Sequence, residues 1–402
     1  MKKLIFLTAI LLVFTSTERI FAESSSLQIL WSDDIPDGRS PKDGIVLQDI
    51  SQGSDGTVIG LARKGGGAGL VIHPNESGLG KITKLDTKAE VLHLFQGEAG
   101  ALWAVGLTGR RMTVPGWTKS DAFLGRLGRH GKFIAEYSFP SRRFRLIESL
   151  ALLDSGKLVV TGRDGQNWLA AISDQGQILW QQWLGVGKRS DVSASVKGVV
   201  MVTFDSTTKG SKQNYKEDVV VWSFDMSGHV LGRHLIRSSI NTSSVSNYGR
   251  LSLEKSKDAL FVLSSWPDSM NPKPLEVTKL TLDGTVHWSK EISHSLSLRD
   301  KSKWTTCNQG QTILDNGDLL VVCAIENQIF ASRLDARNGH AIVLSVPLPA
   351  CHEGLPAVLF PMQRPNGTIW VFGSRPISNV AKSCTWLGEL SLGSSKASIG
   401  SE

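Results

Sequence analysis

Basic and aromatic side chains gather in segments rich in Gly, Pro and Ser that separate short apolar runs. Guanidinium and ammonium groups beside aromatic rings can bind anionic ligands, from acidic polypeptides to the phosphates of lipids or glycans. A solvated basic surface without a partner is the alternative. The candidate binding residues are Arg110, Arg111, Trp117, Arg142, Arg143, Arg145, Trp266, Lys303 and Trp304.

Catalytic signatures are scarce. The sequence contains neither G-x-S-x-G nor H-E-x-x-H, and the glycine-rich run from Arg63 to Gly69 lacks the Lys-Ser/Thr that a phosphate-binding loop requires. The nine histidines are scattered singly. We therefore predict no cofactor and no metal site, and no catalytic residue is identified.

The N-terminus has the pattern of a secretory signal peptide, with cleavage expected after Ala22. Lys2 and Lys3 precede an apolar run from residue 4 to residue 14, which is too short to span a membrane. An uncleaved signal anchor is the alternative. We expect an exported protein, periplasmic or secreted and monomeric, with no membrane span and no nucleic-acid partner. The full sequence has a net charge of +7, which is only mildly basic.

Internal repeats predict the fold. Pairs of apolar runs joined by Asp-Gly or Asn-Gly turns recur along the chain, as in residues 152–162, 170–180, 277–288, 313–324 and 363–373. Such turns suit tight hairpins because Gly and Asx residues tolerate positive φ. Two alternating hairpins make one four-stranded antiparallel unit, so the chain is predicted to be all-β, a single β-propeller.

The first-hairpin turns predict seven blades, although two of them are weak and six or eight blades are also compatible. The last unit lacks a fourth strand. Residues 27–35 supply it, because their Trp-Ser pair at Trp31 matches the one at Trp288. We therefore expect the N-terminal strand to close the ring, with the propeller spanning residues 23–392 and residues 393–402 forming a flexible tail.

Four cysteines fall in the final two units: Cys307, Cys323, Cys351 and Cys384. Since strand register sets Cys307 nearly opposite Cys323, two disulfides are expected in an oxidising compartment, Cys307 with Cys323 and Cys351 with Cys384. A metal site that adds His352 is the alternative, but the spacings match no zinc pattern.

The repeat resembles that of the pyrroloquinoline-quinone-like propeller superfamily, which includes quinoprotein dehydrogenases and the lipoprotein of the Bam complex. A Gly stands four residues before a Trp at Gly176 and Trp180, and again at Gly284 and Trp288. The adjacent cysteines of quinoprotein alcohol dehydrogenases are absent, so the resemblance implies a fold and no activity.

Long connections are expected on the propeller face opposite the tight turns, including residues 63–69, 106–120, 205–218, 264–276 and 293–304. Such loops on a rigid scaffold commonly build binding surfaces. We therefore expect a non-enzymatic propeller that binds a protein or an anionic envelope component through this face. The alternative is an oxidoreductase or hydrolase with a site at the mouth of the central channel.

Overall fold

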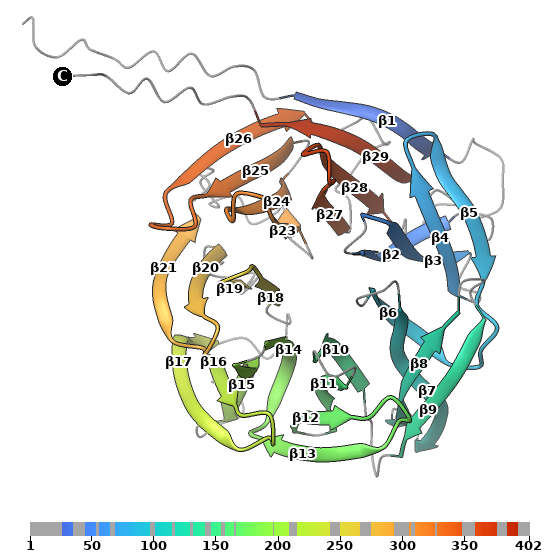
Figure 1. Ribbon diagram of the computed structural model, residues 1–402, viewed down its shortest axis with the longest axis vertical. Helices are drawn as coiled ribbons and strands as arrows, with labels where there is room; N and C mark the ends of the chain where they lie inside the picture. Colours follow the sequence, from blue (N-terminus) through green and yellow to red (C-terminus); the bar gives the residue numbers. More distant parts are fainter. Residues whose placement is uncertain are drawn as a thin grey trace, which may run out of the picture.

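The computed structural model describes residues 26–34, 45–53, 56–64, 69–96, 101–114, 117–128, 132–140, 146–153, 157–164, 166–195, 197–208, 215–241, 250–265, 275–292, 305–306, 310–325, 328–347, 358–375 and 384–392. These residues form seven antiparallel sheets arranged in a ring (Figure 1). The chain is therefore a seven-bladed β-propeller, which confirms the predicted fold and excludes six or eight blades. The predicted signal peptide and tail lie outside the described residues.

The strands of each blade follow one another from the channel to the rim. The first three blades are β2 (Ile45–Gln52), β3 (Val58–Lys64), β4 (Gly69–Asn75) and β5 (Gly78–Lys84); β6 (Glu90–Gln96), β7 (Leu102–Val114), β8 (Trp117–Leu127) and β9 (Phe133–Phe139); and β10 (Leu146–Leu152), β11 (Leu158–Arg163), β12 (Asn167–Ile172) and β13 (Ile178–Leu184).

The next three blades repeat this order, with the inner strand of the sixth broken into two pieces. They are β14 (Gly187–Ser195), β15 (Gly198–Thr208), β16 (Tyr215–Phe224) and β17 (Val230–Asn241); β18 (Arg250–Lys255), β19 (Ala259–Ser265), β20 (Leu275–Thr281) and β21 (Val286–Ile292); and β22 (Thr305–Thr306) with β23 (Gln311–Ile313), then β24 (Leu319–Ile325), β25 (Gln328–Leu334) and β26 (Ala341–Pro347).

The seventh blade joins the two ends of the chain. It consists of β27 (Val358–Gln363), β28 (Ile369–Arg375), β29 (Cys384–Ser391) and the N-terminal strand β1 (Ser26–Asp34). β1 pairs antiparallel with β29, and Ser32 lies opposite Trp386 (Figure 1). The predicted closure of the ring by the N-terminal strand is confirmed.

Apolar side chains fill the spaces between neighbouring blades, as the alternation along each strand requires. Trp168 of β12 is fully buried, and its ring lies 6.2 Å from that of Phe139 in the preceding blade. The buried cluster between the third and fourth blades likewise combines Leu169 of β12 with Met201 of β15. Each blade is therefore stabilised mainly by its two neighbours.

Aromatic residues on the outer strands also hold neighbouring blades together. The Trp180 indole of β13 donates a hydrogen bond to the Met226 carbonyl in the next blade at 3.1 Å. Its ring packs on Gly228, where an added Cβ would lie 2.6 Å from ring carbons and where φ is +85°. Tyr137 packs on Gly176 of the following blade in the same way. The turn glycine is needed both for its φ and for the ring above it.

Two of the predicted long loops are largely strand. β7 and β8 pair as far as Val114 and Trp117, and β15 and β16 pair as far as Thr208 and Tyr215. The prediction that Arg110, Arg111 and Trp117 lie in a loop was therefore wrong. β-branched residues between Thr108 and Val114 favour extended backbone, and Gly109 at φ +64° together with shifts in the pairing register accommodates the irregularity.

Candidate functional site

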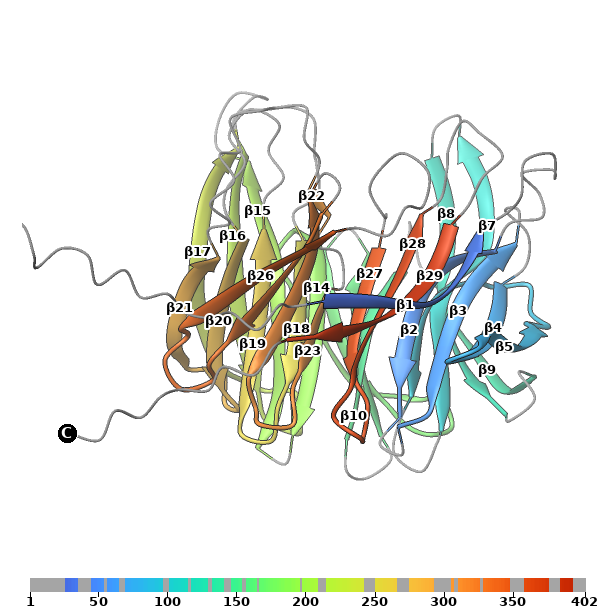
Figure 2. The same cartoon turned by 90° about the horizontal axis from the view of Figure 1, so that it is seen from above.

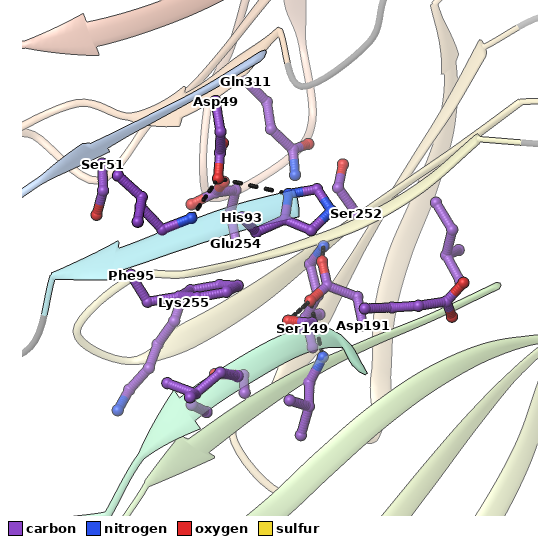
Figure 3. Close-up of a pocket in the computed structure, with 18 of the residues that line it drawn as sticks. Asp49, Ser51, His93, Phe95, Ser149, Asp191, Ser252, Glu254, Lys255 and Gln311 are labelled. Atoms are coloured by element: carbon purple, nitrogen blue, oxygen red, sulfur yellow. Dashed lines mark hydrogen bonds and ion pairs between the residues drawn. The ribbon is translucent and has the colours of Figure 1, made fainter. Parts of the chain in front are cut away.

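The inner strands surround a central cavity of about 960 Å³. Its lining comes mainly from β2, β6, β10, β14, β18, β23 and β27, with Arg163 added from the end of β11. Four carboxyl groups and one histidine line it: Asp49, His93, Glu148, Asp191 and Glu254. Figure 3 labels Asp49, His93, Asp191 and Glu254. An active site at the channel would require carboxyl and imidazole groups to point into one space in this way.

Two of the aspartates bind backbone groups of the next blade. Asp49 Oδ2 accepts the N–H of Leu94 in β6 at 2.9 Å, while its Oδ1 accepts the N–H of Ile50 at 3.0 Å. A register shift in β2 between Leu47 and Asp49 marks a β-bulge next to this carboxylate. Asp49 is 8% exposed. It therefore ties the first blade to the second.

Asp191 repeats this arrangement between the fourth and fifth blades. Its Oδ2 accepts the N–H of Leu253 in β18 at 2.7 Å, and its Oδ1 accepts the N–H of Val192 at 2.8 Å. The Ser149 hydroxyl of β10 donates to the same carboxylate. Burial raises the pKa of Asp191, and these hydrogen bonds partly oppose the rise.

Glu148 links the third blade to the fourth. Its Oε2 accepts hydrogen bonds from the backbone N–H and the hydroxyl of Ser190 in β14, at 2.9 and 3.0 Å. Its Oε1 lies 2.7 Å from Nε of Arg163. Burial raises the pKa of Glu148, and the Arg163 guanidinium counteracts part of that rise.

His93 of β6 lies beside Asp49, with 3.4 Å between Nδ1 and Oδ2. Burial alone would lower its pKa, but Asp49, Glu148 and Asp191 together raise it above 6.5. Figure 3 shows the imidazole directed into the cavity. A partly exposed imidazole beside a carboxylate can accept and donate a proton.

Glu254 of β18 also has a raised pKa. Burial and the neighbouring negative charge of Asp191 raise its pKa to about 8, against a small lowering by the Gln311 amide. Glu254 is therefore predominantly protonated at neutral pH, unlike an exposed carboxyl group.

The described residues contain no group of three or more His, Cys, Asp or Glu arranged to hold a metal ion. No helix long and apolar enough to span a bilayer occurs in the described part of the chain.

The predicted binding residues lie away from this cavity or outside the described ranges. Arg110 and Arg111 are in β7 and Trp117 is in β8, where Arg111 pairs with Lys119 and Trp117 with Val114. The remaining predicted residues are not among those described: Arg142, Arg143, Arg145, Trp266, Lys303 and Trp304.

The cysteines are only partly described. Cys323 of β24 is fully buried and disulfide-bonded, and Cys384 begins β29. Cys307 and Cys351 lie outside the described residues, so the pairing stays a prediction. The neighbouring pairs Thr305 with Ile325 and Thr306 with Ala324 have the register that a bridge from Cys307 to Cys323 requires.

Sequence reasoning missed every polar residue of the channel. One signal was present: Asp49-Ile50-Ser51 and Asp191-Val192-Ser193 repeat an Asp, a β-branched residue and a Ser on two inner strands. Both aspartates make the same pair of hydrogen bonds. His93, Glu148 and Glu254 have no comparable signature.

Comparisons with known proteins give the fold alone. No protein-family model matches the sequence, and no curated protein matches it. Among solved structures, the chain is similar to the WD40 domain of Neurospora crassa Pan2, with a TM-score of 0.51 and 12% identity over 90% of this chain and 95% of that one. BamB from Moraxella catarrhalis gives a TM-score of 0.44 and 12% identity over 90% and 99% of the chains. At 12% identity, the similarity to the Pan2 domain supports the β-propeller fold and no activity.

Proposed function

We propose that this chain is an exported, non-enzymatic β-propeller that binds a protein or an anionic envelope component. Binding would use the long-loop face, meaning the ends of the blades opposite their tight turns. The observation that carries the proposal is the β7–β8 hairpin. These strands are 13 and 11 residues long, and the added length carries Arg110, Arg111 and Trp117. Figure 2 shows this hairpin and β16–β17 rising on the same side of the ring.

The role of the channel carboxylates supports binding over catalysis. Asp49, Glu148 and Asp191 each accept a backbone N–H from the next inner strand. A carboxylate held in this way positions two neighbouring blades. The contacts between blades therefore account for these buried carboxylates without a catalytic role.

Export is supported by the N-terminal sequence. Lys2 and Lys3 followed by the apolar run to residue 14 have the order of a signal peptide. Repeat spacings such as Gly176 to Trp180 are similar to those of pyrroloquinoline-quinone-like propellers. Both features belong to the same proposal of an envelope protein.

Affinity capture from an envelope extract tests the proposal. Two variants are compared with the intact protein: Arg110→Ser with Arg111→Ser, and Arg142→Ser with Arg143→Ser and Arg145→Ser. We expect each to weaken capture of a specific partner about tenfold at low salt, and raised ionic strength to mimic the substitutions, because exposed ion pairs are weak and screened.

The control removes three positive charges from the opposite face, as many as the triple arginine variant removes. Lys157, Lys197 and Lys257 are exposed and lie in the first-hairpin turns of three blades. The triple Lys→Ser variant should capture the partner as the intact protein does. The long-loop face is not the binding surface if the control loses the partner to the same extent. The same holds if capture is unchanged by salt and by all three sets of substitutions.

Catalysis at the channel is the second candidate, favoured by the proximity of His93 to Asp49. It predicts that small molecules compete with the partner and that His93→Gln abolishes a turnover detectable in the intact protein. A partner that His93→Gln still captures with unchanged affinity favours the binding function.

A further inference from the structure

Gln311, at the start of β23, has an amide without hydrogen-bond partners in the wall of the channel. The residue is 5% exposed, and its Oε1 accepts no hydrogen bond. Its Nε2 lies near enough to Glu254 to act on that carboxyl group but makes no hydrogen bond of ordinary geometry. Figure 3 shows the amide directed into the same space as His93. A buried amide that forms no hydrogen bonds is destabilising, so such a group in a native protein commonly meets a ligand or ordered water.

No cationic group of the described residues acts on the Glu254 carboxyl group, which lies near Gln311. Asp191 and Glu254 influence each other electrostatically, and Gln311 lies beside Glu254. Among the described residues, the nearby basic groups are engaged elsewhere: Arg163 with Glu148, and Lys255 Nζ with the carbonyl of Ala194. An ionised Glu254 beside Asp191 would therefore place two negative charges close together, with only His93 acting on one of them.

The cavity also has apolar surface beside these groups. Phe95 of β6 lines it together with Leu152 and Met362 (Figure 3 labels Phe95). An aromatic face attracts cations, and the aliphatic side chains can cover a short hydrocarbon chain. No described group of three or more His, Cys, Asp or Glu could ligate a metal ion. These features favour an organic cation over a bare metal ion.

We propose that the channel binds a small organic cation, an alkylammonium group that donates hydrogen bonds to the Glu254 carboxylate and to Gln311 Oε1. Asp191 supplies additional negative potential, and Phe95 contacts the hydrocarbon. The ligand thereby supplies the hydrogen bond that the Gln311 carbonyl lacks and the positive charge that Glu254 lacks.

Binding is coupled to a proton. Because Glu254 has a pKa of about 8 in the empty channel, a cation that requires its carboxylate displaces the proton at neutral pH. Affinity therefore rises as the pH increases from 6 to 9. The other charged groups that line the cavity come from all the neighbouring inner strands: Asp49, His93, Glu148 with Arg163, Arg189, Asp191 and Lys255. His93 also loses its charge in part of this range, which acts in the same direction.

Isothermal titration of the full mature chain with butylammonium chloride tests the site, with 1-butanol as the uncharged analogue. We expect butylammonium to bind about tenfold or more tightly than 1-butanol. The measured heat should depend on the ionisation enthalpy of the buffer at pH 7, which reports proton release. Equal affinity for the two compounds, or no heat with butylammonium, would overturn the proposal, as would displacement by an equimolar amount of magnesium chloride.

Two variants locate the site. Glu254→Gln should weaken butylammonium binding about tenfold and remove the proton release, because the charge is lost while the shape is kept. Gln311→Leu should weaken binding too, which provides a second measurement if Glu254→Gln folds poorly. Asp258→Asn, in the exposed β18–β19 turn of the same blade, is the control and should bind as the intact protein does. Unchanged affinity in both channel variants would contradict the assignment.

Discussion

Asp191 of β14 accepts the backbone N–H of Leu253 in the inner strand of the next blade at 2.7 Å. It also accepts the N–H of Val192 and the Ser149 hydroxyl. Asp191→Ala would leave three donors without an acceptor, each loss being worth about 1–3 kcal/mol. Burial raises the pKa of Asp191 because a buried charge is unfavourable. Removing that charge in Asp191→Ala therefore offsets part of the stability lost with the three hydrogen bonds.

We expect Asp191→Ala to lower the free energy of unfolding by about 2 kcal/mol. Urea denaturation followed by tryptophan fluorescence measures the change. Asp86→Ala, at an exposed position between the first two blades, should change stability by less than about 0.5 kcal/mol. If the two variants unfold at the same urea concentration, the carboxylate does not hold the blades together.

Gly228 and Gly317 separate two effects of a turn glycine. Both have φ of +85°, but a Cβ at Gly228 would lie 2.6 Å from the Trp180 ring, whereas a Cβ at Gly317 would meet nothing within 4 Å. Gly317→Ala should therefore cost only the left-handed conformation, about 1–2 kcal/mol. Gly228→Ala should cost about 1–3 kcal/mol more because of overpacking.

Thermal unfolding of both variants measures this difference. Trp180→Ala should reduce the cost of Gly228→Ala, because it removes the ring that the new Cβ meets, and it should leave the cost of Gly317→Ala unchanged. Equal effects of the two alanines in the intact background would mean that Trp180 can move aside freely.

The closure of the ring predicts unequal effects of two deletions. Removing residues 26–34 takes away the partner of β29, which leaves an unpaired edge and one blade of three strands. We expect this variant to aggregate and to unfold at lower temperature, as measured by gel filtration and calorimetry. Removing residues 393–402 should have little effect. A synthetic peptide of residues 26–34 should restore part of the stability, and a deletion variant that stays monomeric and equally stable would contradict this.

The fold was predictable because its information is local. Turn residues such as Asp225 and Gly228 set a hairpin by their own backbone preferences, and the recurrence of such turns counts the blades. The closing strand was predictable because the last unit lacked a partner that only the N-terminus could supply.

The channel was not predictable because its residues meet only across blades. Glu148 and Ser190 are distant in sequence, and their contact depends on the angle between two sheets. Nothing in the sequence around Gln311 or Glu254 distinguishes a channel position from an exposed one. The hairpin at residues 106–120 was misjudged for a related reason, since Gly109 and the following residues resemble a loop until pairing with β8 is known.

The disulfide of Cys323 has a predicted partner in Cys307. If the pairing of Thr306 with Ala324 continues by one residue, Cys307 lies opposite Cys323. Peptide mapping without reduction should recover a peptide pair containing both cysteines. Reduction should lower the free energy of unfolding by about 3 kcal/mol, the value typical of a loop of roughly 15 residues. A bridge from Cys323 to Cys351 or Cys384 would contradict the pairing.

Glu254 predicts a defined pH dependence of stability. Its pKa is about 8 in the folded protein and 4.5 in the unfolded chain. Between these values the folded protein binds more protons than the unfolded chain, so the contribution of Glu254 to stability falls as the pH rises and is lost above about pH 8.

The Glu254→Gln variant tests this dependence. Its amide cannot ionise, so its stability does not fall with pH for this reason. Relative to the intact protein, the variant should therefore gain about 1–3 kcal/mol between pH 5 and pH 9, since channel water screens the full effect. Urea denaturation at four pH values measures the difference. Parallel stability curves would mean that Glu254 titrates normally and that the channel is well solvated around it.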